Sequence, residues 1–535
     1  MTTKFTNRRL NYVKLNTAPA RTMLSKKGDL PFSFGKCLTN NPSGAAFKFA
    51  SIFFTFYLLA SLIYYPSILV NGRIWAEEAR EFLIPLASTS QPLDIIFYLH
   101  KGHLDLFPNI ATYFSLILPI QLTPYIFVWV SLIPIACFSI CFGCYLYRFA
   151  FLRLGAEAFK KAKLLQFFWI SGLGFLASSC FIGVESHMNT LNSWTFIVAS
   201  VALLVPITQT PNAPFFATIF ISISPILAFP SVLFSPWLFL QLIFSRSSRI
   251  KAQNIFFFIS CAIQVALPRM LQSNWSFGDD RCFQMRDIIA VIPSLLIKNI
   301  TPLIGNIHGF DRQSNSAWQN HSILTFSSII CLIFCGLLIY TYSKNTNLRY
   351  LFSEYSFHGD KSLAIAIGST SILILSWQIS AIASSGNGAY AQLMLGGGYR
   401  YTNSIFLVFL AIISIVFLSS TSINTVSAHL IGKSDSWRVR KLNVDQVNTI
   451  QALSIGWLAL MLTLSISLQN KRHLSDDFWC FFSRPEWLYQ DHNEFIAASQ
   501  DPKSIFTCPR GWDNTMQGQK KKNKEGKKEF CSQQY

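Results

Sequence analysis

Long uncharged apolar runs constrain the fold of this chain more than any other feature. Residues 49–70 carry no charged side chain, and a helix needs roughly 18–20 apolar residues to cross a bilayer. Only 13% of the 535 residues are charged, about half the share that soluble proteins carry. Run 49–70 is also too long for a cleaved signal peptide and follows a polar arm. The sequence therefore predicts an all-α polytopic membrane protein.

The apolar runs predict about eleven transmembrane helices, within a range of roughly nine to thirteen. The N-terminus is expected in the cytoplasm and the C-terminus outside. The predicted spans are 49–70, 123–149, 164–182, 191–207, 214–229 with a proline-broken continuation to 244, 255–267, 323–342, 363–383, 405–423 and 449–468.

The distribution of basic residues sets the predicted orientation. With these spans, 24 Lys and Arg fall in cytoplasmic segments, 9 in external loops and 11 in the tail after Gln469, as the positive-inside rule expects. This rule also decides that segment 104–119 lies in the interface, because a span there would put the basic stretch 148–163 outside. The charge of +19 thus reflects membrane topology, and no nucleic-acid partner is predicted.

Three regions follow from this reading of the chain. Residues 1–48 form a basic cytoplasmic arm, residues 49–468 a membrane domain, and residues 469–535 an external tail that is disordered after about 517. In the oxidising external space, Cys480 and Cys508 are expected to form a disulfide. Cys137, Cys141 and Cys144 share one helical face. They are interpreted as small apolar packing groups, with a metal site as the less favoured alternative.

Three carboxylates stand together directly after the first apolar run, in WAEEAREFL (75–83). A helix here places apolar side chains on one face and charged ones on the other. The apolar face holds Trp75, Ala79, Phe82, Leu83 and Leu86, and the charged face holds Glu77, Glu78, Arg80 and Glu81. An interfacial helix with an acidic outer face is predicted. A plain solvated face is the alternative.

Other predicted external turns also carry isolated ionisable groups. LHKGHLDLFPN contains His103 and Asp105, GVESHMNTLNSW contains Glu185 and His187, and LGGGYRYTNS contains Arg400 beside Tyr401. Each is an ordinary polar turn when taken alone. Together they place ionisable groups beside aromatic residues at membrane level, where such groups are costly and often functional.

The order of these features resembles the GT-C class of membrane glycosyltransferases, which use polyprenyl-phosphate-linked sugars on the external face of the membrane. Four features carry the resemblance: acids after the first span, juxtamembrane helices, the basic end YRFAFLRLGAEAFKKAK of the second span, and the acid-bearing turn GVESHMNTLNSW. KGHLDLFPN, GGGYRYTNS and TCPRGWD are similar to segments of bacterial members. Such members are expected to carry Arg where Asn109 stands here.

This resemblance implies transfer of a sugar from a polyprenyl-phosphate donor to an external glycan, lipid or protein, in a bacterial plasma membrane. Such transfer needs a carboxylate base and compensation of the departing phosphate. Glu78 is the first choice for the base, with Glu77 as alternate or metal ligand. The other assigned groups are His103, Asp105, Glu185 and His187 for substrate, and Arg400 with Tyr401 at the phosphate. A divalent metal ion is left open as a cofactor.

Two other function classes stay open at this point. A transporter or flippase for lipid-linked sugars would place ionisable groups at mid-membrane between broken helices, whereas the acids here collect at one predicted face. A non-catalytic assembly subunit would keep the fold without turnover. Membrane lipid is a partner in all three interpretations, and the sequence specifies no protein partner.

Overall fold

The computed structural model describes residues 42–151, 163–178, 188–209, 213–271, 361–384, 403–418 and 444–471. Short gaps within these ranges fall at 73, 75–77, 88, 90, 101–102, 246 and 416. The chain divides into two units, Met1–Gly44 and Ala45–Tyr535, and of the first unit residues 42–44 are described.

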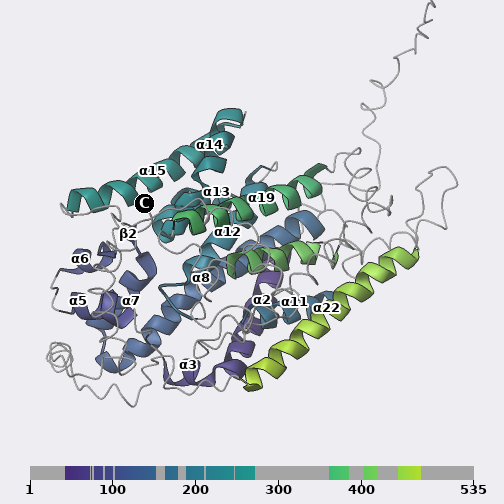
Figure 1. Cartoon of the computed structure of the whole chain (residues 1–535), viewed down its shortest axis with the longest axis horizontal. Helices are drawn as coiled ribbons and strands as arrows, with labels where there is room; N and C mark the ends of the chain where they lie inside the picture. Colours follow the sequence, from purple (N-terminus) through teal and green to yellow (C-terminus); the bar gives the residue numbers. More distant parts are fainter. Residues whose placement is uncertain are drawn as a thin grey trace, which may run out of the picture. The chain divides into compact units, whose positions relative to one another are not determined.

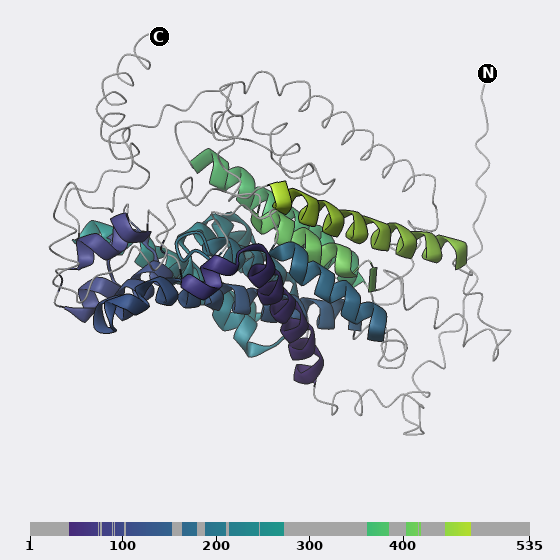
Figure 2. The ribbon, with the colours of Figure 1, turned by 90° about the horizontal axis from the view of Figure 1, so that it is seen from below.

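The described chain is mostly helical, with one two-stranded sheet (Figures 1 and 2). Its elements are α2 (Pro42–Tyr64), α3 (Pro66–Asn71), a π-helix (Ala79–Leu83), α5 (Ile84–Leu86), α6 (Pro92–Ile96), β1 (Leu99–His100), β2 (His103–Leu104), α7 (Leu106–Ile117), a 3-10 turn (Ile120–Leu122), α8 (Thr123–Leu146), a π-helix (Tyr147–Phe151), α11 (Lys163–Ala177), α12 (Trp194–Thr208), α13 (Phe215–Leu227), a 3-10 helix (Phe229–Phe234), α14 (Ser235–Phe244), α15 (Ser248–Leu271), α19 (Lys361–Ser384), the helix Asn403–Ile415 and α22 (Val444–Lys471).

Two of the described helices are long and apolar enough to cross a membrane. They are Gly44–Tyr64 and Ile120–Ala150, with mean hydropathies of 1.8 and 2.3 over their most apolar windows. Several shorter apolar helices of 10–17 residues accompany them. The helical class and an association with the membrane are thus supported, whereas the number of spans and their orientation stay predictions.

Most predicted spans that fall on described residues are helices at the expected places. The first one differs, because α2 ends at Tyr64 and Pro66 begins the separate helix α3. Proline lacks the amide hydrogen that would continue the ladder, so the chain bends there. Segment 104–119 forms α7, whose 12 residues extend only about 18 Å, too short for a bilayer core.

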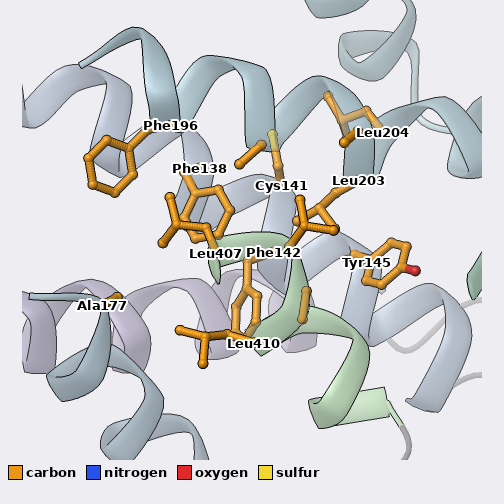
Figure 3. Close-up of a cluster of buried hydrophobic side chains, with 14 of the residues drawn as sticks. Phe138, Cys141, Phe142, Tyr145, Ala177, Phe196, Leu203, Leu204, Leu407 and Leu410 are labelled. Atoms are coloured by element: carbon orange, nitrogen blue, oxygen red, sulfur yellow. The ribbon is translucent and has the colours of Figure 1, made fainter. Parts of the chain in front are cut away.

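The main hydrophobic core lies where α8 packs against α12, and α2, α11 and helix Asn403–Ile415 contribute to it. Figure 3 shows Cys141 of α8 among buried hydrophobic side chains such as Phe142 and Leu407. Cys137, Cys141 and Cys144 are free thiols. The interpretation of Cys141 as a small apolar packing group is confirmed by its burial.

Two glycines let α2 approach its neighbours closely. A Cβ added at Gly143 of α8 would stand 2.3 Å from the carbonyl oxygen of Ala46. A Cβ added at Gly174 of α11 would stand 2.4 Å from the carbonyl oxygen of Phe53. Because backbone atoms cannot yield as flexible side chains do, both positions require glycine. These contacts fix the position of α2 against α8 and α11.

Several predicted features lie outside the described residues. They are the span 323–342, the end of the basic loop up to residue 162, the arm before residue 42 and the tail after residue 471 with its Cys480–Cys508 disulfide.

Candidate functional site

The described part of the acidic segment, residues 78–83, folds as a wide helical turn instead of the predicted regular α-helix. Ala79–Leu83 is π-helical, and its i→i+5 bonding adds a residue to the turn. Glu78 and Leu83 therefore fall on the same side, and both are buried, at 1% and 0% exposure. The prediction that Glu78 lies on an acidic outer face was wrong, because Glu78 stands four positions before Phe82 and a helical turn places both side chains on the same buried side. The buried apolar positions Phe82 and Leu86 were predicted correctly.

Glu78 binds the turn that precedes α12, 112 residues away along the chain. The amide N–H of Thr190 donates to Glu78 Oε1 at 2.7 Å, and the Thr190 hydroxyl donates to the same oxygen. All of these atoms belong to buried residues. A carboxylate that accepts buried donors forms charge-assisted bonds, which are the stronger kind. The first two predicted external segments therefore meet at Glu78.

The turn around Thr190 is itself held by local hydrogen bonds. Asn189 Oδ1 accepts from the amide of Leu191 at 2.8 Å and from the amide of Asn192 at 3.3 Å. Met188 has a φ of 48°, a conformation that is uncommon outside glycine. The bonds to Asn189 hold the backbone of the turn in which Thr190 lies.

Strands β1 and β2 bring two histidines to one face of a hairpin. The antiparallel register pairs Leu99 with Leu104 and His100 with His103, and directly paired side chains lie on the same face. Asp105 follows His103 by two positions, which keeps it on that face. Leu99 and Leu104 occupy the opposite face and are buried.

The imidazoles and the carboxylate are close enough to act together. His100 Nδ1 lies 3.1 Å from Asp105 Oδ2, and His103 Nε2 lies 3.3 Å from the same oxygen. On the other edge of His100, Nε2 lies 3.5 Å from Glu81 Oε2. His103 also stacks on Phe229 with ring centroids 4.7 Å apart. The one group of described His, Cys, Asp and Glu residues with the spacing of metal ligands is His100, His103 and Asp105.

The charges in this cluster favour an ionised carboxylate. Burial raises the pKa of the Asp105 carboxyl, but the charge of His103 and hydrogen bonds from both imidazoles outweigh it and bring the pKa to about 2. Burial, together with the nearby charge of Glu81, raises the pKa of the Tyr98 phenol. Asp105 is therefore an anion under all ordinary conditions.

Two amides fix this hairpin in the fold. Gln264 of α15 accepts from the amide of Leu104 at 2.9 Å, and its Nε2 donates to the Leu104 carbonyl at 3.1 Å. Asn109 of α7 is fully buried and donates to the carbonyls of Ile96 and Tyr98 at 3.0 and 2.8 Å. At the position where an arginine was expected, the amide of Asn109 therefore has a structural role.

The predicted site residues divide into two groups. Glu78, His103 and Asp105 are described and belong to neighbouring parts of one loop region, linked by Glu81 and His100. Glu77, Glu185, His187, Arg400, Tyr401, Cys480 and Cys508 lie outside the described residues. His100 was missed. The sequence signal for His100 is its place in HKGH, three positions before His103.

Comparisons with protein-family models, characterised proteins and solved structures find no match to this chain.

Proposed function

We propose that this chain is a GT-C-like membrane glycosyltransferase that moves a sugar from a polyprenyl phosphate to an acceptor outside the membrane. The observation that carries the proposal is the bond between Glu78 and Thr190. It joins the acid-rich segment after the first apolar helix to the turn before α12. A base and a lipid-phosphate site built from separate external loops require these loops to meet.

The position of the ionisable groups supports chemistry at a surface. The two helices suited to span a membrane carry Lys48 and Arg148 as their charged residues, and each stands close to a helix end. Glu78, Glu81 and Asp105 instead gather in the loop region between these helices. A transporter would need ionisable groups within the spans. Passage through the membrane is therefore the weaker candidate.

Burial divides the roles of the neighbouring acids. Glu78 is 1% exposed, and its Oε1 is engaged by two donors from Thr190. A base must touch the acceptor hydroxyl, so Glu78 is assigned as the residue that anchors the acidic turn. Glu77, the adjacent carboxylate and the earlier alternate, takes the role of base, and this assignment rests on its place in the sequence.

The proposed sugar transfer is a single displacement at the anomeric carbon. The acceptor oxygen forms a bond to the anomeric carbon of the sugar while the bond from that carbon to the phosphate oxygen breaks. Glu77 takes the hydroxyl proton, and the electron pair leaves with polyprenyl phosphate. Arg400 is the proposed cation for the departing phosphate, with Tyr401 beside it and Glu185 and His187 at the acceptor.

Cells that lack the protein provide the first test. Their surface polysaccharide and glycolipid are compared by mass spectrometry with those of cells that produce the wild type, Glu77→Gln, Glu78→Gln or Glu81→Gln. A sugar that is absent without the protein should return with the wild type and stay absent with Glu77→Gln. Normal glycans in every strain would overturn the proposal.

A further inference from the structure

Three side chains of the β1–β2 hairpin form a set that suits a particular class of metal ion. Two imidazoles and one carboxylate converge from His100, His103 and Asp105, and their ligand atoms all lie within 4.8 Å of one another. Imidazole nitrogen suits zinc and other first-row transition metals. Mg²⁺ and Ca²⁺ prefer shells made of oxygen.

The distances match those between ligands of one tetrahedral ion. Bonds of about 2.0–2.1 Å to a tetrahedral centre place neighbouring ligand atoms about 3.3–3.4 Å apart. Asp105 Oδ2 lies 3.1 Å from His100 Nδ1 and 3.3 Å from His103 Nε2. The three groups therefore need little movement to share an ion. Three protein ligands leave a fourth position for water or for an anionic oxygen, as in zinc sites that perform catalysis.

Glu81 lies beside His100, where a histidine that binds a metal usually has a hydrogen-bond acceptor. With Nδ1 turned towards Asp105, the Nε2 edge faces Glu81 at 3.5 Å. A histidine that binds a metal through one nitrogen commonly donates the other N–H to a carboxylate, which fixes its tautomer and orientation.

Access and rigidity also fit a binding site. His100 and Asp105 side chains are 6% and 11% exposed, whereas His103 is 25% exposed and gives a route from solvent. The side-chain amide of Gln264 in α15 hydrogen-bonds the backbone N–H and carbonyl of Leu104 at 2.9 and 3.1 Å. These bonds fix the backbone between His103 and Asp105. Preorganised ligands of this kind lower the cost of binding.

We propose that His100, His103 and Asp105 bind one divalent transition-metal ion of the zinc type, with Glu81 orienting the imidazole of His100. This metal site stands on side-chain geometry and does not depend on glycosyl transfer. If the protein binds the ion but transfers no sugar, the metal site holds and the proposed function fails. If it transfers sugar without binding the ion, the proposed function holds and the metal site fails.

The test measures Zn²⁺ binding to the full-length protein in detergent after treatment with a chelator. Zn²⁺ is titrated against a chromophoric competitor for the wild type, His103→Ala, Asp105→Asn and the control Asp94→Asn, an exposed carboxylate of α6. The wild type and the control should bind one more tight equivalent than the other two variants. Loss of a ligand should weaken this equivalent by at least about 10-fold, because even outer partners contribute about 10–100-fold.

Cobalt separates this site from the chain's cysteines. Co²⁺ bound by nitrogen and oxygen should give visible absorption without a thiolate charge-transfer band, in the wild type and in Asp94→Asn. Size-exclusion profiles of all four proteins check that they are folded. The proposal is overturned if the folded wild type binds no Zn²⁺ tightly, if all four proteins bind it equally, or if equimolar Mg²⁺ displaces it.

Discussion

Glu78 and Thr190 form the contact that joins two distant loops, so its loss should destabilise the protein. Glu78→Ala removes the acceptor of two buried donors, the amide and the hydroxyl of Thr190. A buried donor left without a partner costs about 1–3 kcal/mol. We therefore expect Glu78→Ala to cost roughly 2–6 kcal/mol, a large share of the stability of an ordinary domain.

Glu78→Gln separates anchoring from base catalysis. Glutamine keeps an oxygen at the same place and can accept both hydrogen bonds, but it loses the charge. Because bonds to charged groups are about twice as strong as neutral ones, we expect a cost of about 1 kcal/mol and a folded protein. As an anchor, Glu78→Gln should keep most of its transfer activity. As a base, it would lose roughly 10²–10⁴-fold in rate.

Thermal unfolding in detergent is the measurement, with Thr190→Val as the partner in a double-mutant cycle. Thr190→Val removes the hydroxyl and retains the amide. The penalty of Glu78→Ala should therefore shrink by about 1–2 kcal/mol when Thr190→Val is already present. Equal stability of Glu78→Ala and the wild type would refute the anchor. A folded Glu78→Gln without activity would return the role of base to Glu78.

Three further predictions address topology, the tail and helix packing. A cysteine at position 161 should resist impermeant thiol reagents in intact cells, and free labelling would place the basic loop outside. Mass mapping of unreduced protein should find Cys480 joined to Cys508, whereas two free thiols would contradict the predicted external disulfide; the bridge should stabilise the tail by roughly 3–4 kcal/mol. Gly143→Ala should destabilise by about 1–3 kcal/mol, because the new Cβ meets a backbone oxygen of α2 at 2.3 Å. The matched control Gly368→Ala, with nothing within 4 Å, should be neutral or stabilising in a thermal melt.

The positions of the helices could be predicted because the apolar runs report them locally. The run 123–149 became α8 with its π-helical end at Phe151, and the run 363–383 became α19. The break at Pro66 was also predictable from the local sequence, because proline lacks the amide hydrogen that a continuing helix needs. The orientation of Glu78 was predicted incorrectly, because it was assigned to the charged face although it stands four positions before the buried Phe82.

The geometry of the site depended on contacts that no local pattern contains. No sequence pattern links Thr190 to Glu78, because the two residues are 112 positions apart along the chain. His103 and Asp105 were identified from their segment, whereas His100 joined them only through the register of β1 and β2. Pairing across a hairpin is set by the turn. A strand of two residues gives too short a pattern to predict that register.

Consumption of a lipid donor by the purified protein tests the central claim most directly. The full-length chain in lipid nanodiscs is incubated with a panel of polyprenyl-phosphate-linked sugars and a membrane extract as acceptor, and the release of polyprenyl phosphate is followed by mass spectrometry. The wild type should consume at least one donor with equal amounts of sugar appearing on an acceptor, and Glu77→Gln should be slower by roughly 10²–10⁴-fold. Undiminished transfer by the variant with Gln at 77, 78 and 81, or no donor consumed by the wild type, would contradict the account.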